Sequence, residues 1–93
     1  MHAVVVRVNI NDFEKGRQFL TEQVVPRVSQ APGFVSGYWT GDDDHSNGLS
    51  IMVFESEDAA RGVAQMVESQ TGQDDAEGIS LEGVEVREVV ANA

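Results

Sequence analysis

The stretch FVSGYWTGDDDHSNGLSIMVF, residues 34–54, has the pattern of two β-strands joined by a polar connection. Its first run, residues 34–40 (FVSGYWT), is rich in the aromatic and β-branched residues that favour strands. Its second run, residues 49–54, alternates between two faces, with Leu49, Ile51 and Val53 on one and Ser50, Met52 and Phe54 on the other. The pattern predicts a β-hairpin, around which the rest of the chain must be arranged.

The connection contains Asp42, Asp43, Asp44 and His45, which together raise the question of a metal site. A calcium loop that starts at Asp43 needs an acidic ligand at its twelfth position, and that position is Phe54. A zinc or iron site needs further histidines, and His2 is the only other histidine in the chain. Asp, Asn, Ser and Gly are also the residues that tight turns prefer. We therefore interpret this segment as a hairpin turn and predict no metal site.

The segment before the hairpin predicts a strand and a helix. In residues 4–10 the side chains of Val4, Val6, Val8 and Ile10 share one face of a strand. Asn11, with Glu14 three residues later, resembles a capping box and predicts a helix start. The next segment has one apolar helical stripe, formed by Phe13, Leu20, Val24 and Val28. Pro26 should kink this helix, and Pro32-Gly33 should end it.

The segment after the hairpin predicts a second helix and a last strand. Ser56 is a good N-cap for a helix over residues 56–69, and residues 84–90 (VEVREVV) have the pattern of a strand. The polar, acidic segment 70–83 between them is predicted to be a loop. The order β-α-β-β-α-β predicts one domain over residues 1–93 in the α+β class. It would be a ferredoxin-like sandwich whose four-stranded antiparallel sheet carries both helices on one face.

The charge and composition narrow the classes of partner. Sixteen acidic against six basic residues give a net charge of −10, which disfavours nucleic acids and anionic membranes. The chain has no cysteine, no apolar run long enough to span a bilayer and no signal-peptide pattern. We expect a cytoplasmic protein.

The sheet face away from the helices is the candidate site. Strand alternation predicts that it carries Arg7, Asn9, Met52, Phe54 and Arg87 together with either Tyr38 or Trp39, because the register of that strand is open. A mixed apolar and polar surface of this kind is typical of a small-ligand site. The structural alternative is that Arg7 pairs with Glu85 and that Met52 and Phe54 pack in an interface. In both cases we expect a homodimer through this face, because a bare patch of this kind usually marks an interface.

Two stretches resemble a known family. VVPRVSQAPGFVSGYW (residues 24–39) and LSIMVFESEDAARGVAQ (residues 49–65) are similar to the dimeric α/β-barrel superfamily, within it to antibiotic-biosynthesis-monooxygenase-type domains. In that superfamily a proline near the end of the first helix precedes a Pro-Gly and the second strand. The third strand then runs into a helix start like FESEDAA (residues 54–60). The resemblance extends to about Gln70.

The resemblance implies a cofactor-independent, monooxygenase-like enzyme that acts on a small phenolic or polyketide-type molecule in a barrel cavity. Arg7 and Asn9 would hold the substrate anion, and Tyr38 or Trp39 would stack on its ring with Phe54, beside Met52 and Arg87. Many of these relatives carry tryptophan where this chain has Phe54. The haem-degrading relatives use a histidine of the second helix, and residues 56–69 contain none. The alternative is a non-catalytic ligand-binding or purely structural dimeric domain.

Overall fold

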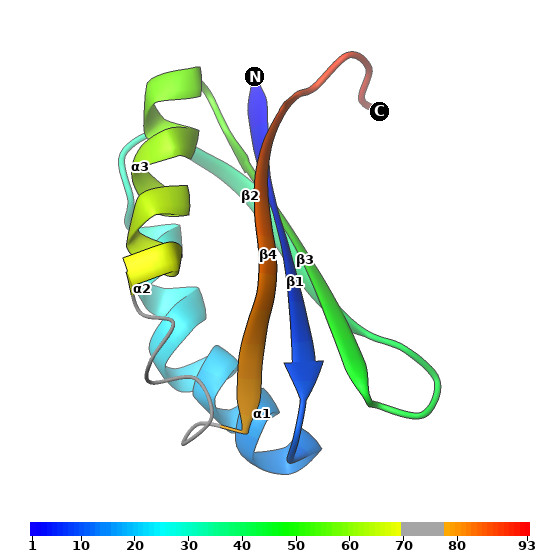
Figure 1. The fold of residues 1–93 in the computed structure, drawn as a ribbon. Coiled ribbons are helices and arrows are strands. Elements are labelled where there is room, and N and C mark those ends of the chain that lie inside the picture. The colour runs from blue at the N-terminus through cyan, green and yellow to red at the C-terminus, as the bar shows by residue number, and fades with distance from the viewer. Residues whose placement is uncertain (70–77) are drawn as a thin grey trace.

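The computed structural model describes residues 1–69 and 78–93, in which four strands form one antiparallel sheet. The strands are β1 (His2–Ile10), β2 (Phe34–Gly41), β3 (Asn47–Phe54) and β4 (Ile79–Glu88), in the spatial order β2-β3-β1-β4. The helices α1 (Phe13–Phe19), η1 (Leu20–Val24), α2 (Val25–Ser29) and α3 (Glu57–Ser69) all lie on one side of the sheet (Figure 1). The predicted ferredoxin-like βαββαβ sandwich is confirmed.

Two predicted boundaries are wrong. The predicted loop 70–83 lies partly outside the described residues, but residues 79–83 belong to β4, since Ile79 pairs with Ile10 and Leu81 with Val8. The first helix is capped by the residue after Asn11, because the Asp12 carboxylate accepts a hydrogen bond from the Lys15 amide at 3.1 Å. The predicted Ser56 cap is confirmed by a 3.2 Å bond from the Ala59 amide to its hydroxyl.

The first helical region is one continuous run that changes its winding before Pro26. Segment η1 is a π-helix, and the amide of Val25 donates to the carbonyl of Leu20, five residues back. A proline inside an α-helix clashes with the carbonyl four residues earlier and cannot donate a hydrogen bond. A wider turn relieves both problems, so the predicted disturbance at Pro26 takes the form of a π segment that directly precedes it.

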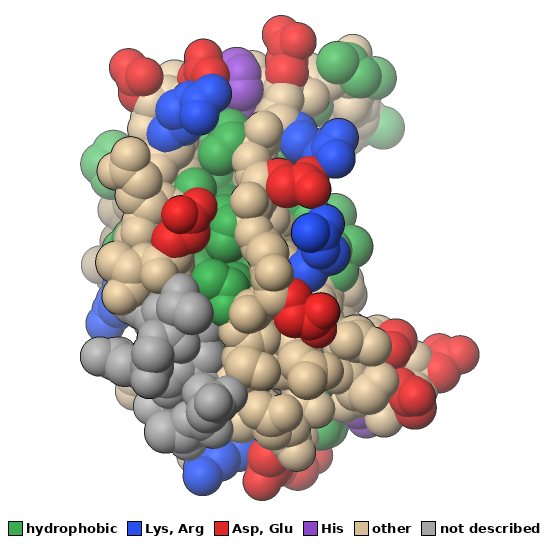
Figure 2. All heavy atoms as spheres, in the orientation of Figure 1, with side chains coloured by type: hydrophobic (Ala, Val, Ile, Leu, Met, Phe, Trp, Pro, Cys, Tyr) green, Lys and Arg blue, Asp and Glu red, His purple; other side chains and the backbone are tan. Residues whose placement is uncertain are grey.

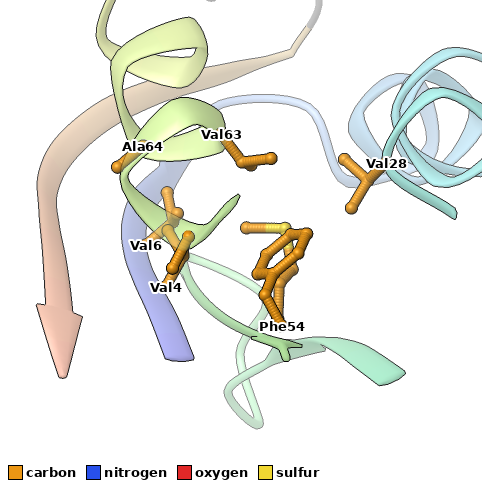
Figure 3. Packing of buried hydrophobic residues seen from close by; sticks show 8 residues of the cluster. Val4, Val6, Val28, Phe54, Val63 and Ala64 are labelled. Carbon is orange, nitrogen blue, oxygen red and sulfur yellow. The ribbon is translucent and has the colours of Figure 1, made fainter. Parts of the chain in front are cut away.

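The β1–β3 register decides which face of β3 is buried. Val4 lies opposite Met52 and Val6 opposite Ser50, so these residues share one sheet face, as directly paired residues do. This face meets the helices, and Met52 (2% exposed) and Phe54 (fully buried) lie in the core with Val4 and Val6. Figure 3 shows Val28, Val63 and Ala64 meeting it from the helices. The prediction that Met52 and Phe54 lie on the open face is therefore wrong.

The open face carries the other set of β3 side chains. Tyr38, Leu49 and Ile51 are its exposed apolar residues, with Ile51 paired to both Tyr38 and Val5. We call Val5, Tyr38, Leu49 and Ile51 the open-face patch. In the part of the chain that the structure describes, no helix is both long enough and apolar enough to cross a bilayer.

Candidate functional site

A cavity of about 310 Å³ lies between the sheet and the first helical region. Its floor comes from β1, β3 and β4, and its walls come from α1, η1, α2 and α3. Most of its lining is apolar: Val6, Val8, Phe19, Leu20, Val24, Val28, Met52, Met66, Val67, Ile79 and Leu81. The π segment thus borders the cavity, as π turns often do at functional sites.

The only tryptophan of the chain lies on the wall of this cavity. Trp39 is paired with Ser50, so it faces the helices, whereas Tyr38 faces the other way and is 68% exposed. Gly37 makes room for the indole, because a Cβ atom there would lie 2.9 Å from Trp39 Cη2. The sequence left open which of Tyr38 and Trp39 lies on the open sheet face, and the structure places Tyr38 there and Trp39 on the helix-facing side.

Three polar side chains join the apolar lining. Ser50 is 7% exposed, and its hydroxyl makes no hydrogen bond to another described residue. Gln23 and Arg27, four residues apart on the helix, lie at the mouth of the cavity. Arg27 has no ion-pair partner among the described residues, although acids outnumber bases in this chain. The cavity therefore offers an aromatic wall, a buried hydroxyl and an unpaired cation.

The predicted site residues divide between the two faces of the sheet. Trp39 and Met52 line the cavity, and Phe54 belongs to the core. Arg7, Tyr38 and Arg87 belong to the open face, and Asn9 is exposed near the end of β1.

Ser50 and Arg27 are the cavity residues that sequence reasoning did not select. The signal for Arg27 was present, because Gln23 and Arg27 each directly precede a member of the predicted apolar stripe, Val24 and Val28. Polar residues beside a buried apolar stripe lie at the edge of the helix face that packs on the sheet. Ser50 was predicted to lie on the open face together with Met52. The β1–β3 register places both side chains on the helix-facing side instead.

On the open face the charges satisfy one another. Arg7 Nη1 lies 3.2 Å from Glu85 Oε1, and Arg87 Nε lies 2.6 Å from Glu85 Oε2. The hydrogen bonds from Arg87 and then Arg7 lower the pKa of the Glu85 carboxyl. Figure 2 shows basic and acidic side chains alternating along the side of β4 away from the helices. This arrangement agrees with the structural alternative for Arg7, except that the pair is exposed in a single subunit.

The hairpin connection is a turn held by its own side chains. Asp42 Oδ1 accepts hydrogen bonds from the amides of Ser46 (3.0 Å) and Asn47 (3.1 Å), and Asp44 Oδ1 accepts one from the Ser46 hydroxyl at 2.7 Å. The hydrogen bonds that Asp42 accepts lower the pKa of its carboxyl, with the Asn47 amide as the largest cause. Among the described residues, no group of three or more histidine or acidic side chains is arranged to hold a metal ion. The turn interpretation is confirmed by these hydrogen bonds.

Solved structures share this architecture. A protein from Deinococcus radiodurans, inferred to be an antibiotic biosynthesis monooxygenase, matches with a TM-score of 0.64 at 14% identity, over 98% of this chain and 95% of that one. A Streptomyces coelicolor monooxygenase, solved with nanaomycin D, matches with a TM-score of 0.59 at 17% identity, over 99% of this chain and 92% of that one. A dimeric ferredoxin-like protein from an uncultured marine organism matches with a TM-score of 0.61 at 10% identity, over 100% of this chain and 98% of that one.

These likenesses confirm the expected resemblance at the level of the fold. No family model matches the sequence, and no curated protein matches it either. Structural likeness at such low sequence identity establishes the ferredoxin-like fold that the antibiotic-biosynthesis-monooxygenase-type proteins share. It does not identify a substrate.

Proposed function

We propose that this protein is a homodimeric, monooxygenase-like enzyme that binds a small phenolic or polyketide-type molecule between its sheet and its helices. The observation that carries the proposal is the cavity itself, in which an apolar lining meets Trp39, Ser50 and Arg27, a cation without an ion-pair partner among the described residues. Its volume of about 310 Å³ is at the lower end of the roughly 300–1,000 Å³ typical of ligand pockets.

The polar groups suit an acidic aromatic ligand. The indole of Trp39 offers a flat surface for a ring, and the buried Ser50 hydroxyl offers a hydrogen bond to a ring substituent. The Arg27 cation at the mouth favours the ionised form of a nearby phenol, because an opposite charge lowers its pKa. A phenolate is electron-rich and gives up electrons to oxygen more readily than the neutral phenol does.

The proposed reaction balances without an added reductant. A CH₂ group of the substrate, activated by a ring hydroxyl, reacts with O₂ to give C=O and water. One oxygen atom enters the carbonyl group. The other oxygen atom leaves as water with the two hydrogens of the CH₂ group, and the substrate supplies all four electrons. The protein would bind and orient the anion and exclude water from it.

The dimer is the second part of the proposal. One structural neighbour is a dimeric ferredoxin-like protein, and the open-face patch leaves apolar side chains on the sheet of a single subunit. Pairing of two such faces would bury this patch and form the barrel that the sequence resemblance implies. The ligand-binding roles predicted for Arg7, Asn9, Tyr38 and Arg87 then define an alternative site in the barrel interior. That alternative and the cytoplasmic setting stay predictions.

The test compares two arginines on opposite faces of the sheet. Binding of 6-hydroxy-2-naphthoate is measured by calorimetry, and the indole N–H NMR signal of the single tryptophan reports whether the ligand reaches the cavity. We expect Arg27→Gln to weaken binding by about tenfold, as loss of one charge-assisted contact does, and Arg7→Gln to leave it unchanged. A loss in Arg7→Gln alone would move the site to the barrel interior.

Oxygen uptake separates an enzyme from a binding protein. With 1,8-dihydroxyanthrone, which carries a CH₂ group between phenolic rings, we expect one O₂ consumed per anthraquinone formed and no hydrogen peroxide. Binding without protein-dependent uptake would favour the alternative, a non-catalytic ligand-binding domain. Absence of binding to either compound would refute the proposed function.

A further inference from the structure

A second cavity of about 230 Å³ adjoins the first. The two share five lining residues, which are Val8, Leu20, Trp39, Ser50 and Ile79. Trp39 and Ser50 therefore lie at their junction. The second cavity by itself is smaller than the roughly 300 Å³ at which ligand pockets usually begin. It is best understood as an extension of the first.

The outer wall of the second cavity comes from the turn of the hairpin. His45 stacks on Phe13, the first residue of α1, with ring centroids 3.7 Å apart and planes 8° apart, and both residues line the cavity. Arg17, from the same face of α1, lines it as well, and its guanidinium lies 3.4 Å from the exposed Glu14 carboxylate. The far end of the combined space therefore presents two nitrogen-bearing side chains beside an aromatic ring.

The backbone of His45 belongs to the turn, because its amide donates to the Asp42 carbonyl at 3.0 Å, but its imidazole is not needed to form the turn. The hydrogen bonds of Asp42 and Asp44 already close it, and they use none of the atoms of the imidazole. His45 nevertheless has a φ of 57°, the only positive value at a non-glycine among the described residues. Tight turns commonly require this left-handed conformation, and histidine is one of the non-glycine residues enriched in it. From this backbone position the imidazole stacks against Phe13, which places the ring at the cavity.

We propose that the hairpin turn is the end wall of one elongated binding site, and that His45 is the residue that determines how long a ligand the site accepts. The inference rests on the proposed function, since it extends the same cavity. A single ring would occupy the space at Trp39. A second fused ring with an acidic group would extend to His45 and Arg17, which would receive that group.

The test uses two probes that differ by one ring. 4-Hydroxybenzoate and 6-hydroxy-2-naphthoate carry the same phenol and carboxylate at opposite ends. We expect His45→Ala to weaken binding of the naphthoate by about tenfold, through loss of one ring contact and one hydrogen bond, and to change binding of the benzoate less than about twofold. His45→Phe, which keeps the stack and removes the nitrogens, should bind the naphthoate with intermediate affinity.

The matched control is Asp43→Ala. Asp43 directly neighbours this part of the turn, and it lines neither cavity. We expect it to bind both probes as the parent does, and a melting curve of each variant confirms folding. Equal effects of His45→Ala on both probes, or none on either, would overturn the inference while leaving the proposed function intact. If neither probe binds the parent protein, both the inference and the proposed function fail.

Discussion

At the scale of single residues, the aspartates of the hairpin turn have unequal roles despite their adjacency. Asp42 accepts two backbone hydrogen bonds, whereas Asp43 accepts none from another described residue. The pKa of Asp42 is lowered from its ordinary value of 3.8 because the folded turn stabilises its ionised form. The carboxylate is therefore a structural part of the turn.

We predict that Asp42→Ala lowers the melting temperature at pH 7 by a few degrees, because two amides lose their acceptor. A group whose pKa is lowered on folding contributes stability above its unfolded pKa, and that stability is lost as the pH falls through the folded pKa. The difference between parent and variant should thus shrink below about pH 4. Melting curves of the parent and Asp42→Ala across this pH range measure the difference, with Asp43→Ala as control. A difference that stays constant down to pH 2 would contradict the assignment.

At the scale of elements, the π segment is the feature that links the first helical region to the cavity. Leu20 and Val24 are its end residues, and both line the cavity. Because Pro26 cannot donate to the carbonyl four residues earlier, the sequence itself imposes the irregular turn at this point. The shape of the cavity wall thus depends on a residue that does not line it.

We predict that Pro26→Ala lets the helix relax towards regular α winding, since it restores a backbone N–H and removes the ring. Leu20, Gln23 and Val24 would then rotate about the helix axis. The Trp39 indole signal should shift, and the affinity for 6-hydroxy-2-naphthoate should fall by about fivefold or more, without loss of stability. Pro32→Ala, in the loop after the helix, is the control and should change neither. An unchanged indole signal and affinity in Pro26→Ala would mean that the proline does not shape the wall.

At the scale of the whole molecule, the sheet separates two environments. One face packs on the helices and holds the cavity, and the other carries the open-face patch beside the Arg7–Glu85–Arg87 cluster. The strongly acidic net charge opposes self-association, so an interface must lie where acids are few or paired. Glu85 is paired on this face, which makes the face compatible with a second copy.

We predict that the parent protein sediments with about twice its mass of 10.1 kDa at micromolar concentration. Ile51→Asp, which places a charge in the centre of the open-face patch, should give a folded monomer. Met52→Asp, one residue along the strand, should instead unfold the chain, because Met52 lies in the core. Sedimentation equilibrium and circular dichroism distinguish these results. A parent monomer, or a stable dimer of Ile51→Asp, would exclude this interface.

The sequence by itself determined those features whose residue pattern allows only one interpretation. Residues 4–10 have one wholly aliphatic face, so the helix-facing side of β1 was predictable from alternation alone. The order of the elements, the Ser56 cap and the turn composition were equally explicit. Each depends on local backbone chemistry, which a short stretch of sequence contains in full.

Only the tertiary structure decided which face of the hairpin carries the cavity. Residues 49–54 are apolar on both faces, so alternation does not tell the core from the open face. The pairing of Val4 with Met52 makes this choice, and it reverses the predicted placement of Met52 and Phe54. The β2–β3 register turns Trp39 inward beside Ser50, and the packing of α1 against the turn brings His45 to Phe13. The Val4–Met52 and Phe13–His45 contacts join residues far apart in the chain, and no local pattern encodes such contacts.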